Sequence, residues 1–157
     1  MYSSQYCRPR GFSPFIAKEV AEDFLILREK ALKHLTEESE LEEIVRLVGV
    51  ESLSPKEQLV LFISKLIRED FLYQSAFDPI DQYSSLKKQY SILKTILLFY
   101  ELAEKSIEES IALEDLKKIE VLEKITRARF IEEMEFHIIE EEIKEQINNL
   151  RSKPHHG

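Results

Sequence analysis

Residues 41–57 read LEEIVRLVGVESLSPKE, and this stretch holds the end of one helix and the start of the next. Gly49 follows an apolar run at helical spacing, and glycine suits the left-handed residue that closes a helix. Ser54 and Glu57 then form a capping-box pattern, in which Ser54 accepts a hydrogen bond from the backbone three residues on and Glu57 reaches back to the cap. The stretch therefore predicts two helices joined by a short, rigid elbow, residues 49–57.

Helical periodicity extends from the elbow in both directions. Upstream, apolar residues recur at helical spacing back to Ser13, which can cap a long helix. Downstream, one apolar face runs to Phe71, and after a loop at residues 73–85 either Ser84 or Ser85 can cap a third helix. That helix is apolar on more than one side, so we expect it to be central in the bundle. Its two apolar stripes are Leu86, Tyr90, Leu93, Leu97 and Tyr100, and Ile92, Ile96 and Phe99.

The composition favours an all-α protein. The chain has 157 residues, 43% of them apolar, and only three glycines, so turn formers are scarce. We expect a single α-helical bundle of five or six helices with no sheet, formed by residues 13–150. Its last part predicts one or two short helices over residues 113–130 and a final helix over residues 131–150. Residues 1–12 and 151–157 lack a helical period and are predicted to be a flexible arm and a disordered tail.

Charge and motif content exclude several classes of function. The formal net charge of −8 disfavours nucleic acid and anionic membrane surfaces as partners. Glycines occur only at positions 11, 49 and 157, so the sequence has no G-x-x-x-x-G-K-[ST] loop to hold phosphates. No apolar run is long enough to cross a bilayer, the start has no signal-peptide pattern, and the single Cys7 cannot form an internal disulfide. These features favour a cytoplasmic location.

One helix face could suggest a metal site. Glu133, His137 and Glu141 lie at i, i+4 and i+8, but di-iron bundles need a Glu-x-x-His pair from each of two helices, and position 134 is Met. A solvated face with one histidine is the simpler interpretation. We therefore predict no metal site, and we assign no catalytic residue.

Three blocks of sequence resemble one known family. Residues 41–54 (LEEIVRLVGVESLS) and 67–77 (IREDFLYQSAF) match the pattern ELxEIVxLVGxDxL…IREDFLxQxAF in order and spacing. Residues 81–100 (DQYSSLKKQYSILKTILLFY) match DxYxxLxKxYxxLKxILxFY. These patterns are those of the C-terminal helical domain of the catalytic A (alpha) subunit of V/A-type rotary ATPases and ATP synthases. The chain resembles that domain over most of its length.

The resemblance implies a role beside the nucleotide. Phe77 matches the aromatic residue that packs on the adenine ring of bound ATP, and Gln74, Ser75 and Ala76 would shape the adenine pocket. Stacking of one ring on another needs only a flat apolar face and adds affinity without chemistry. From the residues alone, Phe77 would instead be interpreted as a core aromatic residue under a loop.

The resemblance also implies contact with the central stalk, because the elbow matches in position the helix–turn–helix tip that bears on it. The stalk-contact residues would be Glu51, Ser52, Leu53, Pro55, Lys56 and Glu57. Glu51, Lys56 and Glu57 are the exposed charges expected there, and Pro55 and Lys56 make the tip less acidic than its F-type counterpart. A generic, well-capped turn is the alternative that the residues leave open.

In that family, A subunits alternate with B subunits in a ring around the stalk, and the complex couples ATP hydrolysis or synthesis to ion transport. The resemblance thus implies B and central-stalk subunits as partners, a peripheral place in the membrane complex without insertion, and ATP or ADP with Mg in the full subunit. In isolation we expect no cofactor and no enzyme activity, because the phosphate loop and catalytic residues lie on other segments of that subunit. The rival interpretation is a stand-alone helical adaptor that binds a partner protein through an exposed apolar groove.

Overall fold

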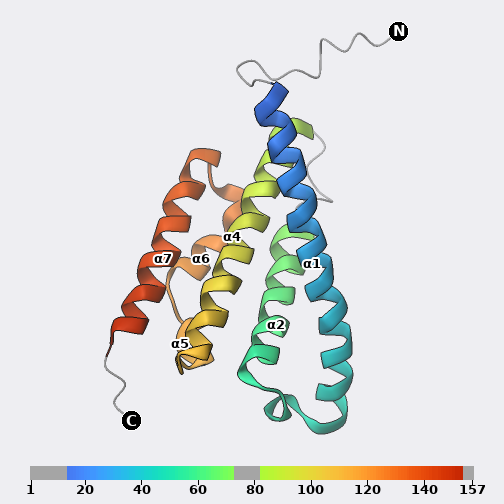
Figure 1. Ribbon diagram of the computed structural model, residues 1–157, viewed down its shortest axis with the longest axis vertical. Helices are drawn as coiled ribbons and strands as arrows, with labels where there is room; N and C mark the ends of the chain where they lie inside the picture. Colours follow the sequence, from blue (N-terminus) through green and yellow to red (C-terminus); the bar gives the residue numbers. More distant parts are fainter. Residues whose placement is uncertain (1–13, 73–81, 154–157) are drawn as a thin grey trace.

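A computed structural model of the protein describes residues 14–72 and 82–153, and all regular structure within them is helical (Figure 1). The sequence-based prediction of an all-α bundle of five or six helices without a sheet is confirmed over these residues. The α-helices are α1 (Pro14–Val48), α2 (Pro55–Leu66), α4 (Gln82–Glu108), α5 (Leu113–Leu116), α6 (Val121–Thr126) and α7 (Phe136–Ser152). The short elements are the 3-10 helices η2 (Val50–Ser52), η4 (Ala128–Phe130) and η5 (Glu133–Glu135), and the π-helix η3 (Ile67–Leu72).

Helices α1 and α2 form an antiparallel hairpin along one side of the molecule (Figure 1). With 35 residues, α1 is about 50 Å long, so it extends well beyond α2. The α2 start is the predicted capping box: Ser54 Oγ accepts from Glu57 N at 3.3 Å, and Glu57 Oε2 accepts from Ser54 N at 2.7 Å. The strongest local signal in the sequence therefore fixes the turn between the two helices.

Helix α4 lies at the centre of the bundle, as its apolar pattern predicts. It packs against α1, α2 and α7. Its Phe99 ring meets Phe62 of α2 edge-on at 6.2 Å between centroids, and its Tyr90 ring meets Phe24 of α1 at 6.1 Å. The fully buried core members of this helix are Ile92, Leu93, Ile96, Phe99 and Ala103.

The C-terminal part closes the other side of α4. Helix α7 buries the predicted stripe Ile139, Ile143 and Ile147 against α4, α5 and α6. It continues to Ser152, and Arg151 Nε donates to Glu109 Oε2 at 2.6 Å. Residues 151 and 152, which were predicted to belong to a disordered tail, are therefore helical. The predicted arm at residues 1–12 lies outside the described residues.

Two helix starts differ from the sequence-based prediction. Ser84 and Ser85 lie inside α4 and not at its cap, because serine is also tolerated in a first helical turn and its presence does not mark a unique start. The final helix begins at Phe136 and not near Ile131. The chain is extended at Ile131 and Glu132, and a capping box between Glu132 and Glu135 restarts it. Glutamate is not a preferred capping residue, so this start gave no sequence signal.

The cap of α2 is open to a direct test. Ser54→Ala removes the side-chain acceptor of the first helical turn, so we expect the free energy of unfolding to fall by about 1 kcal/mol. Urea unfolding followed by circular dichroism measures this. Ser152→Ala is the matched control, because its hydroxyl bonds only to Asn148 O in an exposed last turn. Equal losses in both variants would contradict the role given to Ser54.

Candidate functional site

The elbow begins with a glycine whose conformation other residues rarely adopt. Gly49 has φ 91° and ψ 160°, and a Cβ placed on it would lie 3.3 Å from Glu51 Oε2. Its N–H still donates to Val45 O at 2.9 Å and so completes the last turn of α1. The sharp exit from α1 therefore favours glycine at this position, because φ is positive. The ψ of 160° differs from the left-handed helical conformation that the sequence analysis expected.

Hydrogen bonds and one buried side chain fix the rest of the elbow. Ser52 Oγ donates to Gly49 O at 2.7 Å, and Gln58 Nε2 donates to Leu53 O at 3.0 Å. Leu53 is only 5% exposed and packs with Leu41 of α1 and Val60 of α2. Leu53 was predicted to contact the stalk. In the structure it is buried and joins the elbow to both helices of the hairpin.

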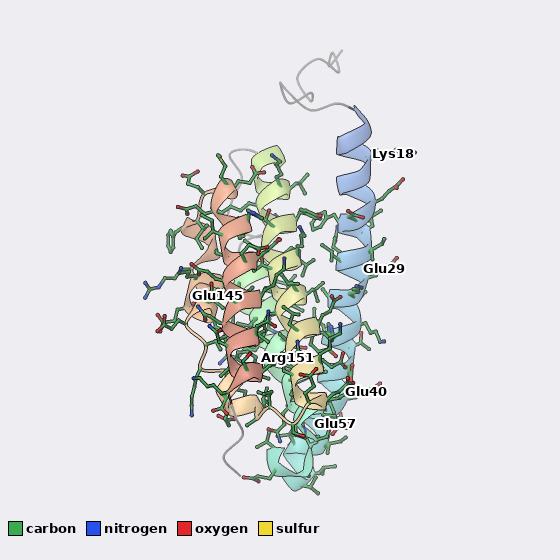
Figure 2. All side chains as sticks on the ribbon, turned by 60° about the vertical axis from the view of Figure 1, so that its left-hand side comes forward. Lys18, Glu29, Glu40, Glu57, Glu145 and Arg151 are labelled. Carbon is green, nitrogen blue, oxygen red and sulfur yellow. The ribbon has the colours of Figure 1, made fainter. Side chains whose placement is uncertain are left out.

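Two of the three predicted contact charges are used inside the domain. Lys56 Nζ pairs with Glu108 Oε1 of α4 at 2.5 Å, and this hydrogen bond raises the pKa of Lys56. The hydrogen bond from the Ser54 backbone lowers the pKa of Glu57, which serves as the reciprocal cap. Glu51, Ser52 and Pro55 are exposed. Figure 2 labels Glu57 at the elbow end of the bundle and Glu40 on α1.

The predicted adenine-side residues Gln74, Ser75, Ala76 and Phe77 lie outside the described residues. The element before them is the π-helix η3, which buries Ile67, Asp70 and Phe71. The apolar periodicity up to Phe71 predicted ordinary α-helix here, and a π-helix has no distinctive residue pattern that could have revealed it. Such single-turn segments often occur at functional sites. Phe71 is a core residue, and its ring meets Phe24 edge-on at 6.5 Å.

Sequence reasoning missed a polar seam that joins α1 to α2 and α4. Ser64 Oγ of α2 donates to His34 O at 3.1 Å. The His34 ring meets the Tyr100 ring of α4 edge-on, with 4.3 Å between the ring centroids. One turn further along α1, the buried Glu38 carboxylate pairs with Arg68 of η3. Burial raises the pKa of Glu38, and the Arg68 guanidinium opposes that shift. The signal available in the sequence was the position of His34 and Glu38 among the apolar residues of one helix face.

The helix face considered for a metal is occupied by ion pairs. Glu133 pairs with Lys87 at 2.5 Å and Glu141 with Lys144 at 2.8 Å. In residues 14–72 and 82–153, no group of three or more His, Cys, Asp or Glu side chains is arranged to hold a metal ion. None of the helices in these ranges combines the length and apolar character needed to cross a membrane.

The fold and the elbow define an all-α bundle domain that holds a helix–turn–helix tip rigidly at one end. Residues 13–117 match the family model of the C-terminal domain of V and A type ATP synthase, and the chain belongs to this family. This membership confirms the resemblance found in the three sequence blocks.

Curated relatives extend the match beyond residue 117. The V-type ATP synthase alpha chain of Thermoanaerobacter pseudethanolicus is 45% identical over 139 residues, which cover 87% of this chain and 24% of that protein. The alpha chains of Clostridium botulinum strain Hall (44% over 144 residues; 90% and 24%) and Acetivibrio thermocellus (45% over 143 residues; 88% and 24%) are similarly close. The chain thus spans about a quarter of the length of these relatives.

The buried His34 gives the domain a testable dependence on pH. Burial lowers the pKa of His34 below its ordinary value of 6.5, Lys33 acts in the same direction, and Glu104 opposes it. As pH falls below 6.5 the unfolded chain binds a proton that the folded chain does not, so stability is lost. His34→Gln should therefore lose less stability than the parent between about pH 7.5 and about pH 5.5.

Denaturant unfolding at each pH gives the free energy of unfolding, and its slope against pH is compared between the parent and His34→Gln. The raised pKa of Glu38 has the opposite effect on stability, but it is present in both proteins and cancels in the comparison. His137→Gln is the matched control, because His137 is exposed, and it should keep the parent's pH dependence. Identical slopes for the parent and His34→Gln would show that His34 does not titrate as its burial requires.

Proposed function

We propose that this chain works as the C-terminal helical domain of an alpha (A) subunit in a V/A-type ATP synthase, with one role at each end of the helical run from Pro55 to Leu72. At one end, the elbow bears on the central stalk. At the other, residues 74–77 form the adenine side of the nucleotide site, with the ring of Phe77 stacked on the base. The observation that carries the proposal is a rigid elbow in a chain that belongs to this family.

The packing of α2 suits a mechanical link between the two ends. From Pro55 to Leu72 the chain is continuously helical over roughly 25 Å, and it is held to α1 and α4 throughout. The Lys56–Glu108 pair and the buried Leu53 fix its elbow end, and Phe71 and the Arg68–Glu38 pair fix its other end. A displacement beside the nucleotide would therefore move the elbow as one body with α2, since no joint lies between them.

The chemistry of ATP would belong to the rest of the subunit. The sequence has no phosphate loop, so this chain alone should neither hydrolyse ATP nor hold ATP or ADP with Mg tightly. Adenine stacking without phosphate contacts supports weak binding at most. The B subunits and the stalk would be its partners, and the peripheral, cytoplasmic sector of the complex its location.

The adenine role predicts a specific kinetic effect in the assembled ring. Phe77→Ala should raise KM for ATP by about tenfold or more through loss of stacking, and Phe77→Tyr should restore it. Steady-state ATP hydrolysis by the ring measures both. If Phe77 is instead a core residue, Phe77→Ala would lower the free energy of unfolding of the isolated chain by about 3–5 kcal/mol and leave KM unchanged.

Site-specific cross-linking tests the stalk contact. In a Cys7→Ser background, Glu51→Cys on the exposed elbow should form a cross-link to a central-stalk subunit in the assembled complex. Glu145→Cys is the control, because Glu145 is exposed on α7, on a different part of the bundle (Figure 2). Mass spectrometry identifies the cross-linked partner. A stalk adduct from Glu145→Cys and none from Glu51→Cys would overturn the proposal and favour the stand-alone adaptor.

A further inference from the structure

Four large apolar side chains are exposed where α1 ends and the elbow begins. Leu47 is 83% exposed, Val48 66%, Val50 44% and Ile44 41%. Ile44, Leu47 and Val48 are spaced i, i+3 and i+4, so they share one side of the last helical turn, and Val50 follows in η2. We call these four residues the tip patch.

The tip patch is not part of the domain's own core. The inward side of the same turn is formed by Leu41 and Val45, which pack with Leu53 and Val60 in the small core cluster under the elbow. None of the four tip-patch residues belongs to that cluster, and all four remain exposed. Adjacent exposed apolar side chains at one end of a rigid hairpin are typical of a surface that another protein covers.

The charges around the tip patch have one sign. Glu40 and Glu43 lie one turn before Ile44 and Leu47 on the same side of α1, and Glu51 follows Val50; all three are exposed. Arg46 is on a different side of the helix, roughly 200° around the axis from Ile44. The nearest lysine of the elbow, Lys56, is already paired with Glu108. The patch is therefore an apolar surface with an acidic rim.

We propose that the tip patch seats the apolar stripe of an amphipathic helix in the central stalk, a helix whose flanks are lysine and arginine. The acidic rim complements those flanks, and a patch about one turn long matches the ridge of an opposing helix. This inference rests on the proposed function and identifies the chemistry of that contact. The apolar side chains supply most of the binding free energy, and the charges mainly set the orientation of the stalk helix.

The physical reason is that the two kinds of contact differ in strength and in response to salt. An ion pair between exposed side chains contributes little and is screened by salt. Burial of a leucine side chain that was fully exposed is worth more and is not screened. A contact that must hold while it transmits force is better made by the tip patch than by Glu51 alone.

The experiment measures the dissociation constant of the central stalk from the assembled ring, at low and at high salt. Leu47→Ser should weaken binding by about tenfold at both salt concentrations, and Leu47→Met should restore it. Glu51→Gln should weaken binding by less than about threefold, and only at low salt. Leu32→Ser is the matched control, because Leu32 is 65% exposed on the same helix but away from the tip patch, and it should bind as the parent does.

Several outcomes would overturn the inference, and one of them separates it from the proposed function. If Leu47→Ser binds the stalk normally while Glu51→Cys still cross-links to it, the stalk contact exists but the tip patch does not supply its binding free energy. If Glu51→Gln and high salt weaken binding as much as Leu47→Ser does, ion pairs and not apolar burial hold the stalk helix. If the isolated chain dimerises and Leu47→Ser makes it monomeric, the occupant is a second copy. Failure of the cross-link itself would count against the proposed function.

Discussion

Helix α4 buries side chains on more than one side, because the α1–α2 hairpin and α7 contact it from different directions (Figure 1). Phe99 meets α2, Tyr90 meets α1, and Lys94 pairs with Glu140 of α7 at 3.2 Å. Neither the hairpin nor the C-terminal helices could bury an apolar face of this size alone. The rigidity of the elbow therefore depends on how firmly α4 holds α2, through the shared apolar core and through the Lys56–Glu108 pair.

The sequence was most informative where structure is determined locally. Ser54 and Glu57 specify the start of α2 through hydrogen bonds within one turn, so their pattern could be interpreted without knowledge of the fold. The double stripe of α4 likewise follows from helical geometry. The inward position of Leu53 was not predictable in this way, because it depends on Leu41 and Val60, which come from two different helices.

The remaining differences concern structure that depends on distant residues. His34 and Glu38 interrupt an apolar face, and only the positions of Ser64, Tyr100 and Arg68 explain why they can be buried there. For the candidate site, the sequence predicted the elbow and named Glu51, Lys56 and Glu57 as its exposed charges. The structure places Lys56 and Glu57 in internal contacts and exposes apolar residues beside them, which composition alone could not indicate.

The π-helix η3 follows α2 directly, and its geometry affects the chain beyond it more than the elbow. A π-helical turn holds one residue more than an α-helical turn, so each such insertion rotates the chain that follows by roughly 100° relative to a regular helix. Because η3 lies after α2, a gain or loss of one residue there would redirect the backbone leaving Leu72 without altering the elbow. Length changes at this point would turn the chain that follows η3 while the elbow end of α2 keeps its geometry.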